Sequence, residues 1–166
     1  TFSHPGLGES TGYDYTRMQN PTREHLEKTV AALEKGCDCM AFSSGMAAIT
    51  TVMELFKPGD HLIADADLYG GTIRLFDHIS QKSGIEITYV NCSRDDVKAC
   101  IRENTKAVFI ETPTNPMMNV TDIEALAEIT KENHLLLIVD NTFLSPYLQN
   151  PLTLGADIVV HSGTKY

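Results

Sequence analysis

Short apolar runs alternate with amphipathic segments along most of the chain, and this alternation restricts the possible folds more than any other feature. The runs at residues 61–64, 86–90, 107–110 and 135–139 have the length and composition of buried strands. The segments between them have helical periodicity or helix-sized spacing. Strands that alternate with helices indicate βαβ units. We therefore predict an α/β fold, a mainly parallel sheet with helices on both faces.

The beginning of the chain has a different pattern. Residues 1–20 have no helical or strand period, which predicts an extended arm. The sequence Asn20-Pro21-Thr22 then starts a predicted helix that stops at Gly36. Residues 40–42 are predicted to form a short buried strand before a second helix. The predicted organisation is an N-terminal arm, residues 1–20, followed by one α/β domain, residues 21–166.

Composition excludes several classes of protein. The 166 residues are 42% hydrophobic, enough for one sizeable core. A net charge of −9 argues against nucleic acid or an anionic membrane as a partner. No apolar run is long enough to span a membrane, and the opening Thr-Phe-Ser-His-Pro-Gly has neither the charged region nor the apolar core of a signal peptide, so a cytoplasmic protein is expected. The four cysteines lack the spacing of a metal site, so no metal is expected.

An acid and an amine occupy comparable positions near the end of the chain. Asp140 and Lys165 each follow a short apolar run, and open α/β sheets bind ligands at such strand ends. Singly, Asp140 fits a turn and Lys165 fits a solvated surface amine. Together with the hydroxyls of Ser162 and Thr164, they supply what pyridoxal phosphate (PLP) needs, namely a Schiff-base lysine, an acid for the pyridine nitrogen and phosphate donors.

Two further stretches are candidates for phosphate binding. Ser44, Gly45 and Met46 stand at a predicted strand-to-helix junction, where free backbone N–H groups attract anions. The simpler interpretation is a helix N-cap with a tight turn. Tyr15 and Arg17 offer a phenol and a guanidinium with fixed donor geometry, although in an exposed arm such a pair is usually solvated surface.

Two loops that follow predicted strands complete the set. Tyr69, in the sequence Leu-Tyr-Gly-Gly-Thr, offers an aromatic ring flanked by small residues. Asn115 lies between two prolines that hold an extended loop after the run at 107–110, with Glu111 placed to support it. By themselves these residues also fit an ordinary loop tyrosine and an Asn-Pro turn.

Taken together, Val139-Asp140-Asn141-Thr142 and His161-Ser162-Gly163-Thr164-Lys165-Tyr166 closely resemble the cofactor motifs of the Cys/Met-metabolism family of PLP enzymes. This family includes cystathionine γ-synthase, cystathionine γ- and β-lyases and methionine γ-lyase, and the resemblance extends over essentially all 166 residues. It implies the large domain of fold-type I PLP enzymes. It also implies that Lys165 carries the cofactor, that Asp140 holds the pyridine nitrogen protonated and that Tyr69 stacks on the ring and assists the leaving group. The other cofactor contacts that the resemblance implies are Asn115 to the phenolic oxygen, and Ser44, Gly45, Met46, Ser162 and Thr164 to the phosphate, with Tyr15 and Arg17 from a neighbouring subunit.

The activity that this resemblance implies is β- or γ-elimination or replacement on sulfur amino acids or acyl-homoserine, of the cystathionine γ-synthase/lyase type, in trans-sulfuration. Methionine γ-lyase and O-acetylhomoserine sulfhydrylase remain alternatives, although Gly71 stands where methionine γ-lyases often carry cysteine. A PLP aminotransferase and a non-catalytic fragment also remain open. The expected partners are an amino-acid substrate and further copies of the chain, as a dimer that shares active sites and assembles into a homotetramer. Family members continue past the lysine, so a C-terminal domain is expected to be absent from this chain, which alone is expected to be inactive.

Overall fold

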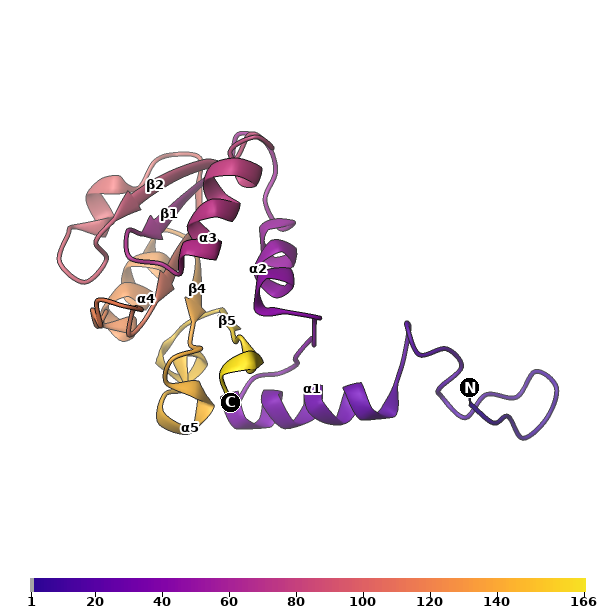
Figure 1. Ribbon diagram of the computed structural model, residues 1–166. Coiled ribbons are helices and arrows are strands. Elements are labelled where there is room, and N and C mark those ends of the chain that lie inside the picture. Colours follow the sequence, from indigo (N-terminus) through magenta and orange to yellow (C-terminus); the bar gives the residue numbers. More distant parts are fainter. Residues whose placement is uncertain (1) are drawn as a thin grey trace. The chain divides into compact units, whose positions relative to one another are not determined.

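The computed structural model describes residues 2–166, so Thr1 of the predicted arm lies outside the described residues (Figure 1). The chain divides into two compact units. The first ends at Ala41 and the second spans Phe42–Tyr166.

A parallel five-stranded sheet forms the centre of the second unit. Its strand order is β2-β1-β3-β4-β5, and every neighbouring pair is parallel. The strands are β1 (His61–Asp65), β2 (Glu86–Val90), β3 (Thr105–Glu111), β4 (Leu136–Asp140) and β5 (Ile158–Val160). Parallel neighbours need long crossovers, which the intervening helices supply. The predicted α/β fold with a mainly parallel sheet is therefore confirmed.

Helices cover both faces of this sheet, and each face has its own apolar core (Figure 1). On one face lie α2 (Gly45–Met53) and α3 (Gly70–Leu75), which continues into the π-helix η1 (Phe76–Ser80). There the Phe76 ring meets Phe109 of β3 edge to face, with 5.3 Å between centroids. On the other face, α4 (Ile123–Glu132) packs Leu126 against the core that contains Val139. Each such buried side chain contributes roughly 1.5–3 kcal/mol, so both faces are held firmly.

Two sequence-based predictions in this region were wrong. Residues 40–42 form no strand and pair with none of the five strands of the described chain, and Met40 is 72% exposed. The segment between the apolar runs at 86–90 and 107–110, where a helix was predicted, contains only a 3-10 turn, η2 (Val97–Cys100). Here Asp96 accepts from the backbone N–H of Lys98, and such local bonds favour turns over longer helices.

Three short helices near the end of the chain were not predicted. They are α5 (Ser145–Leu148), η3 (Pro151–Leu154) and η4 (Gly163–Lys165). Each has four residues or fewer, too few to establish a helical period in the sequence. The last of them carries the candidate lysine.

The first unit consists of turns followed by one helix. Residues 2–20 contain turns and neither helix nor strand. The helix α1 (Pro21–Glu34) starts where the Asn-Pro-Thr sequence predicts, because the Asn20 side chain accepts from the backbone N–H groups of Thr22 and Arg23. It ends at Lys35, which adopts the left-handed conformation with φ 58°.

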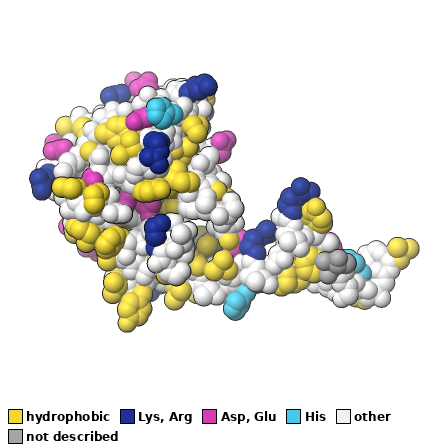
Figure 2. All heavy atoms as spheres, viewed as in Figure 1, with side chains coloured by type: hydrophobic (Ala, Val, Ile, Leu, Met, Phe, Trp, Pro, Cys, Tyr) yellow, Lys and Arg dark blue, Asp and Glu magenta, His cyan; other side chains and the backbone are white. Residues whose placement is uncertain are grey.

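The surface carries mixed charges. On the face of the sheet-containing unit seen in Figure 2, Lys and Arg side chains are spread singly among acidic and apolar ones. Within residues 2–166, no helix combines the length and the apolar character needed to cross a membrane. In the same residues no group of three or more His, Cys, Asp and Glu side chains is arranged to hold a metal ion.

Candidate functional site

The candidate site lies at the carboxyl ends of the sheet strands, on the face covered by α2 and α3. Glu111 ends β3 and pairs in register with Asp140, which ends β4 and pairs with Val160 of β5. Side chains alternate along a strand, so Glu111 and Asp140 project to the same face as Phe109 and Ile138. Two carboxyl groups therefore stand side by side at the end of one apolar core.

Asp140 is a buried carboxyl with one oxygen in use. Asp140 is 7% exposed. Its Oδ1 accepts from the backbone N–H of Thr142 at 3.0 Å and from the Thr142 hydroxyl at 2.6 Å. Among residues 2–166, no hydrogen bond reaches Oδ2. Burial raises the pKa of Asp140, while the bonds from Thr142 and the charges of His161 and Lys165 oppose that rise. A carboxylate in this position gains most from a cationic N–H partner.

Thr142 connects this acid to the segment that carries the lysine. Its hydroxyl donates to Asp140 and accepts from the backbone N–H of Ser162 at 2.8 Å. The backbone N–H of Asn141 also donates to the carbonyl of Val160, at 3.0 Å. No role for Thr142 was predicted from the sequence. A hydroxyl two residues after a strand-end acid is the signal that could have found it.

Gly45 lets the start of α2 approach the segment after β5. A Cβ at this position would lie 2.8 Å from Ser162 Cβ and 3.2 Å from its Cα, closer than carbon atoms approach without a shift. Ser44 caps the helix by accepting from the backbone N–H of Ala47 at 3.1 Å. The predicted phosphate residues Ser44, Gly45, Met46 and Ser162 are thus brought together beside the N-terminus of a nine-residue helix.

Gly71 lets the Tyr69 ring lie close to the backbone at the start of α3, near Met46 of α2. A Cβ at Gly71 would collide with the Tyr69 ring and come within 3.1 Å of Met46 Sδ. Position 71 must therefore lack a side chain while the ring keeps this place, and a cysteine there would require the ring to move. Tyr69 itself is 48% exposed, so its ring is accessible at the strand-end edge.

Glu111 ties two loops to the sheet. It is 6% exposed, and its Oε2 accepts from the backbone N–H of Tyr69 at 2.7 Å. The backbone N–H of Asn115 also favours the ionised form of this carboxyl. Burial raises the pKa of Glu111 to about 7, and the charge of Asp140 adds to the rise, while the two N–H donors oppose it. Near neutral pH, Glu111 therefore carries its proton about half of the time.

The loop that contains Asn115 is held by an acid from the loop after β1. Two cis peptide bonds, before Pro113 and before Pro116, shape this loop. Asp67 Oδ2 accepts from the Thr114 hydroxyl at 2.5 Å and from the Asn119 amide at 3.1 Å. Asn115 itself is exposed. The sequence analysis gave Asp67 no role, because its partners lie 47 and 52 residues away.

The candidate lysine lies in the turn after β5. Thr164 and Lys165 belong to η4 and are exposed, and Ser162 precedes them as the residue before the first turn. The positive charge of Lys165 is close enough to favour the ionised form of Asp140. The Tyr166 hydroxyl lies 2.7 Å from His161 Nδ1 at the end of this segment.

Tyr15 and Arg17 belong to the first unit. They lie in a turn in which the carbonyl of Tyr15 accepts from the N–H groups of Met18 and Gln19. The Arg17 guanidinium lies 5.1 Å from the centroid of the Tyr15 ring, and both side chains are exposed. The turn therefore presents a phenol and a guanidinium together.

Comparison with known proteins supports a common origin for the whole chain. The family model for Cys/Met metabolism PLP-dependent enzymes matches residues 1–166. A cystathionine gamma-synthase/O-acetylhomoserine (thiol)-lyase of Bacillus subtilis (strain 168) is 59% identical over 99% of the chain, and a cystathionine gamma-lyase of the same organism is 55% identical over all of it. The crystal structure of metB from Corynebacterium glutamicum superposes with a TM-score of 0.95, at 51% identity, over 100% of this chain.

These similar proteins are longer than the chain. The chain covers 44% of each of the two Bacillus proteins and 44% of the Corynebacterium structure. The cystathionine gamma-lyase from Lactobacillus plantarum, solved in complex with L-serine, has a TM-score of 0.91 at 48% identity, with 42% of its length covered. The similarity therefore includes the strand-end residues described above and leaves the remainder of these proteins unmatched.

Proposed function

Because the chain belongs to the Cys/Met metabolism family of PLP-dependent enzymes, we propose that the whole protein catalyses β- or γ-elimination or replacement on a sulfur amino acid or an acyl-homoserine. The reaction is of the cystathionine γ-synthase/lyase type. The observation that carries the proposal is Asp140, a buried carboxyl with an unused oxygen. It lies beside a lysine and on the same sheet edge as an anion-binding helix start.

The donor set suits pyridoxal phosphate. The start of α2 offers free backbone N–H groups, and the close approach of Gly45 to Ser162 places a hydroxyl-bearing segment beside them. These residues and Thr164 would hold the phosphate. Asp140 would hold the pyridine nitrogen and Lys165 the aldehyde carbon. Asn115 would face the phenolic oxygen, and Tyr69 would lie on the ring.

When bound, pyridoxal phosphate accepts the electron pair released at the substrate Cα. With the cofactor bound, Asp140 would hold a proton on the pyridine nitrogen, because a buried carboxylate without another donor on Oδ2 favours a cationic partner. Lys165 Nζ, once free, takes the proton from Cα and returns it to a neighbouring carbon. The Tyr69 hydroxyl would donate a proton to the sulfur of a departing thiolate or to the departing oxygen of an acyl group. Glu111 keeps the Tyr69 backbone in place during these steps.

We further propose that Tyr15 and Arg17 serve the phosphate of a neighbouring subunit. Both are exposed and stacked together, and residues 2–20 have no helix or strand of their own. Such an arm gains order most readily across a symmetric interface. The proposed active unit is a dimer that shares its sites, assembled into a homotetramer in the cytoplasm.

Product analysis tests the reaction and separates its alternatives. The whole protein would be incubated with cystathionine, methionine, cysteine and O-acylhomoserine, with and without a thiol acceptor. Formation or cleavage of cystathionine supports the proposal. Sulfhydrylation of O-acetylhomoserine is the second candidate, since the 59% identical relative is named for both activities. A keto acid formed without loss of thiol or ester would instead indicate an aminotransferase and refute the proposed reaction.

A further inference from the structure

We propose that Arg23 is a positioning residue that fixes the turn carrying Tyr15 and Arg17 and thereby presents these two side chains as one phosphate-binding pair. This inference rests on the proposed phosphate role of Tyr15 and Arg17. Arg23 touches neither substrate nor cofactor in this proposal. It acts through the backbone of the turn.

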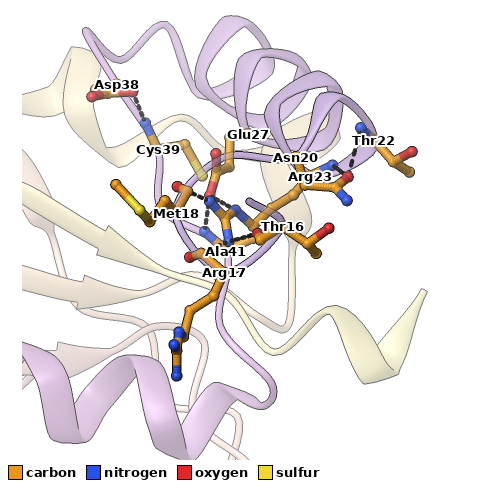
Figure 3. A network of polar contacts seen from close by, with 10 residues as sticks. All are labelled: Thr16, Arg17, Met18, Asn20, Thr22, Arg23, Glu27, Asp38, Cys39 and Ala41. Atoms are coloured by element: carbon orange, nitrogen blue, oxygen red, sulfur yellow. Dashed lines mark hydrogen bonds and ion pairs between the residues drawn. The ribbon is translucent and has the colours of Figure 1, made fainter. Parts of the chain in front are cut away.

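The guanidinium of Arg23 donates hydrogen bonds to three successive carbonyl groups of the turn, at Thr16, Arg17 and Met18 (Figure 3). We call this set of bonds the clamp. Arg23 Nη2 donates to the carbonyl of Met18 at 2.7 Å. Its Nη1 donates to the carbonyls of Thr16 and Arg17 at 3.4 Å and 3.3 Å. The carbonyl of Tyr15 is meanwhile bonded to the N–H groups of Met18 and Gln19. Every carbonyl from residue 15 to residue 18 therefore has a donor within the first unit.

Both the backbone and the side chain of Arg23 are held by other residues of α1 and its N-cap. Its backbone N–H donates to the Asn20 side chain at 3.2 Å, as part of the N-cap of α1. Its Nε lies 3.5 Å from Glu27 Oε1, one helical turn further on. That same oxygen accepts from the backbone N–H of Ala41 at 2.9 Å. The clamp is thus built on the rigid first turns of a 14-residue helix, which makes it a fixed support for the turn before it.

This arrangement directs the Arg17 side chain away from the clamp. Figure 3 shows the Arg17 guanidinium pointing away from the bonds around Arg23. Among residues 2–166 it makes no hydrogen bond or ion pair, and its contact is the Tyr15 ring at 5.1 Å. Because Arg23 binds the nearby carbonyl oxygens, these do not compete for the Arg17 donors. A guanidinium free of acceptors and stacked on a phenol suits a phosphate dianion.

The clamp requires an arginine. All three guanidinium nitrogens of Arg23 are engaged, in directions that a planar fork supplies and a single ammonium does not. We therefore expect Arg23→Lys to restore little of what Arg23→Ala removes. This expectation distinguishes a geometric role from a merely cationic one.

The test measures cofactor binding by the whole protein for Arg23→Ala, Arg23→Lys, Arg17→Ala and the Arg17→Ala/Arg23→Ala double variant. Arg94→Ala, which removes an exposed arginine, is the matched control. Each variant is titrated with pyridoxal phosphate and with pyridoxal, which lacks the phosphate. Arg23→Ala should weaken binding of the phosphate form about tenfold, the effect of losing one or two hydrogen bonds. It should leave pyridoxal binding unchanged. The loss in the double variant should be smaller than the sum of the two single losses, because Arg23 can then act only through Tyr15.

A second readout needs no cofactor. Amide hydrogen exchange at Met18 and Gln19 in the cofactor-free protein should be faster in Arg23→Ala than in wild type and the control. Unchanged exchange would overturn the clamp, and so would additive losses in the double variant. If exchange rises but Arg17→Ala binds the cofactor normally, the clamp stands and the proposed phosphate role of Arg17 fails. The two ideas can therefore fail separately.

Discussion

Replacement of Glu111 by glutamine should make the stability of the protein less dependent on pH. The glutamine keeps an acceptor oxygen for the backbone N–H of Tyr69, which now donates to Glu111 Oε2 at 2.7 Å. It removes the charge that would otherwise form beside Asp140 at high pH. The substitution thus tests the titration of one buried carboxyl with little change in shape.

The magnitude follows from the pKa of this carboxyl. Burial raises it from an ordinary value of 4.5 to about 7. Because the folded state holds the proton more tightly, the stabilisation is fully present below pH 4.5 and is lost as the pH rises toward 7. A rise of about 2.5 corresponds to about 3 kcal/mol, at about 1.4 kcal/mol for each pKa unit. Of this, about 2 kcal/mol should be lost between about pH 5.5 and 8.5.

Urea unfolding of the cofactor-free whole protein at these two pH values measures the effect. Wild type should lose about 2 kcal/mol more than Glu111→Gln when the pH is raised. Glu128→Gln, which removes an exposed carboxyl on α4, is the control and should behave as wild type. An equal loss in wild type and Glu111→Gln would show that Glu111 does not titrate in this range, and the assigned electrostatics of the strand-end acids would then be wrong.

Four further outcomes are expected of the whole protein. Lys165→Ala should abolish the visible absorbance of the bound cofactor, and a band that persists with turnover would place the attachment on another lysine. Asp140→Asn should lower kcat far more than it lowers the melting temperature, since the amide keeps the shape but not the charge; an unchanged rate would reduce Asp140 to a turn residue. Gly45→Ala should cost about 1–3 kcal/mol of stability and weaken cofactor binding, because the new methyl group meets Ser162, and calorimetry with a cofactor titration would detect both. Mixing Arg17→Ala with Lys165→Ala protein should restore activity on subunit exchange if the arm acts in a neighbouring subunit, whereas no recovery would place it in its own.

The strands were predictable from sequence because each is an apolar run of the right length. The run at 86–90 was placed with the bounds that the structure gives, and the runs at 61–64, 107–110 and 135–139 were placed to within two residues. The prediction of a strand at residues 40–42 was wrong for a physical reason. An apolar run forms a strand only where a neighbour completes its hydrogen bonds, and the sequence does not state which neighbours meet.

The candidate site was predictable only where a motif placed its residues close together in sequence. Asp140 and Ser162 were given roles in advance, but Thr142, which joins them, was given none although it lies in the same motif, since its role depends on a contact across 20 residues. No role was predicted for Asp67 for the same reason, since its partners are distant in sequence. Arg23 directly follows the predicted helix start, yet its three carbonyl partners become visible only once the turn before the helix is folded.

The clamp around Arg23 is built from neighbours in sequence, and this sets an order of assembly. Its partners lie five to seven residues away, so the loop closed by each contact is small. The strand-end site instead needs β3 and β4 in register and contacts such as that of Tyr69 with Glu111, 42 residues apart. Closing such loops is slower, because more chain entropy is lost before any contact compensates. On a nascent chain, the turn with the arginine and the phenol should therefore form before Glu111 and Asp140 reach their positions at the ends of β3 and β4.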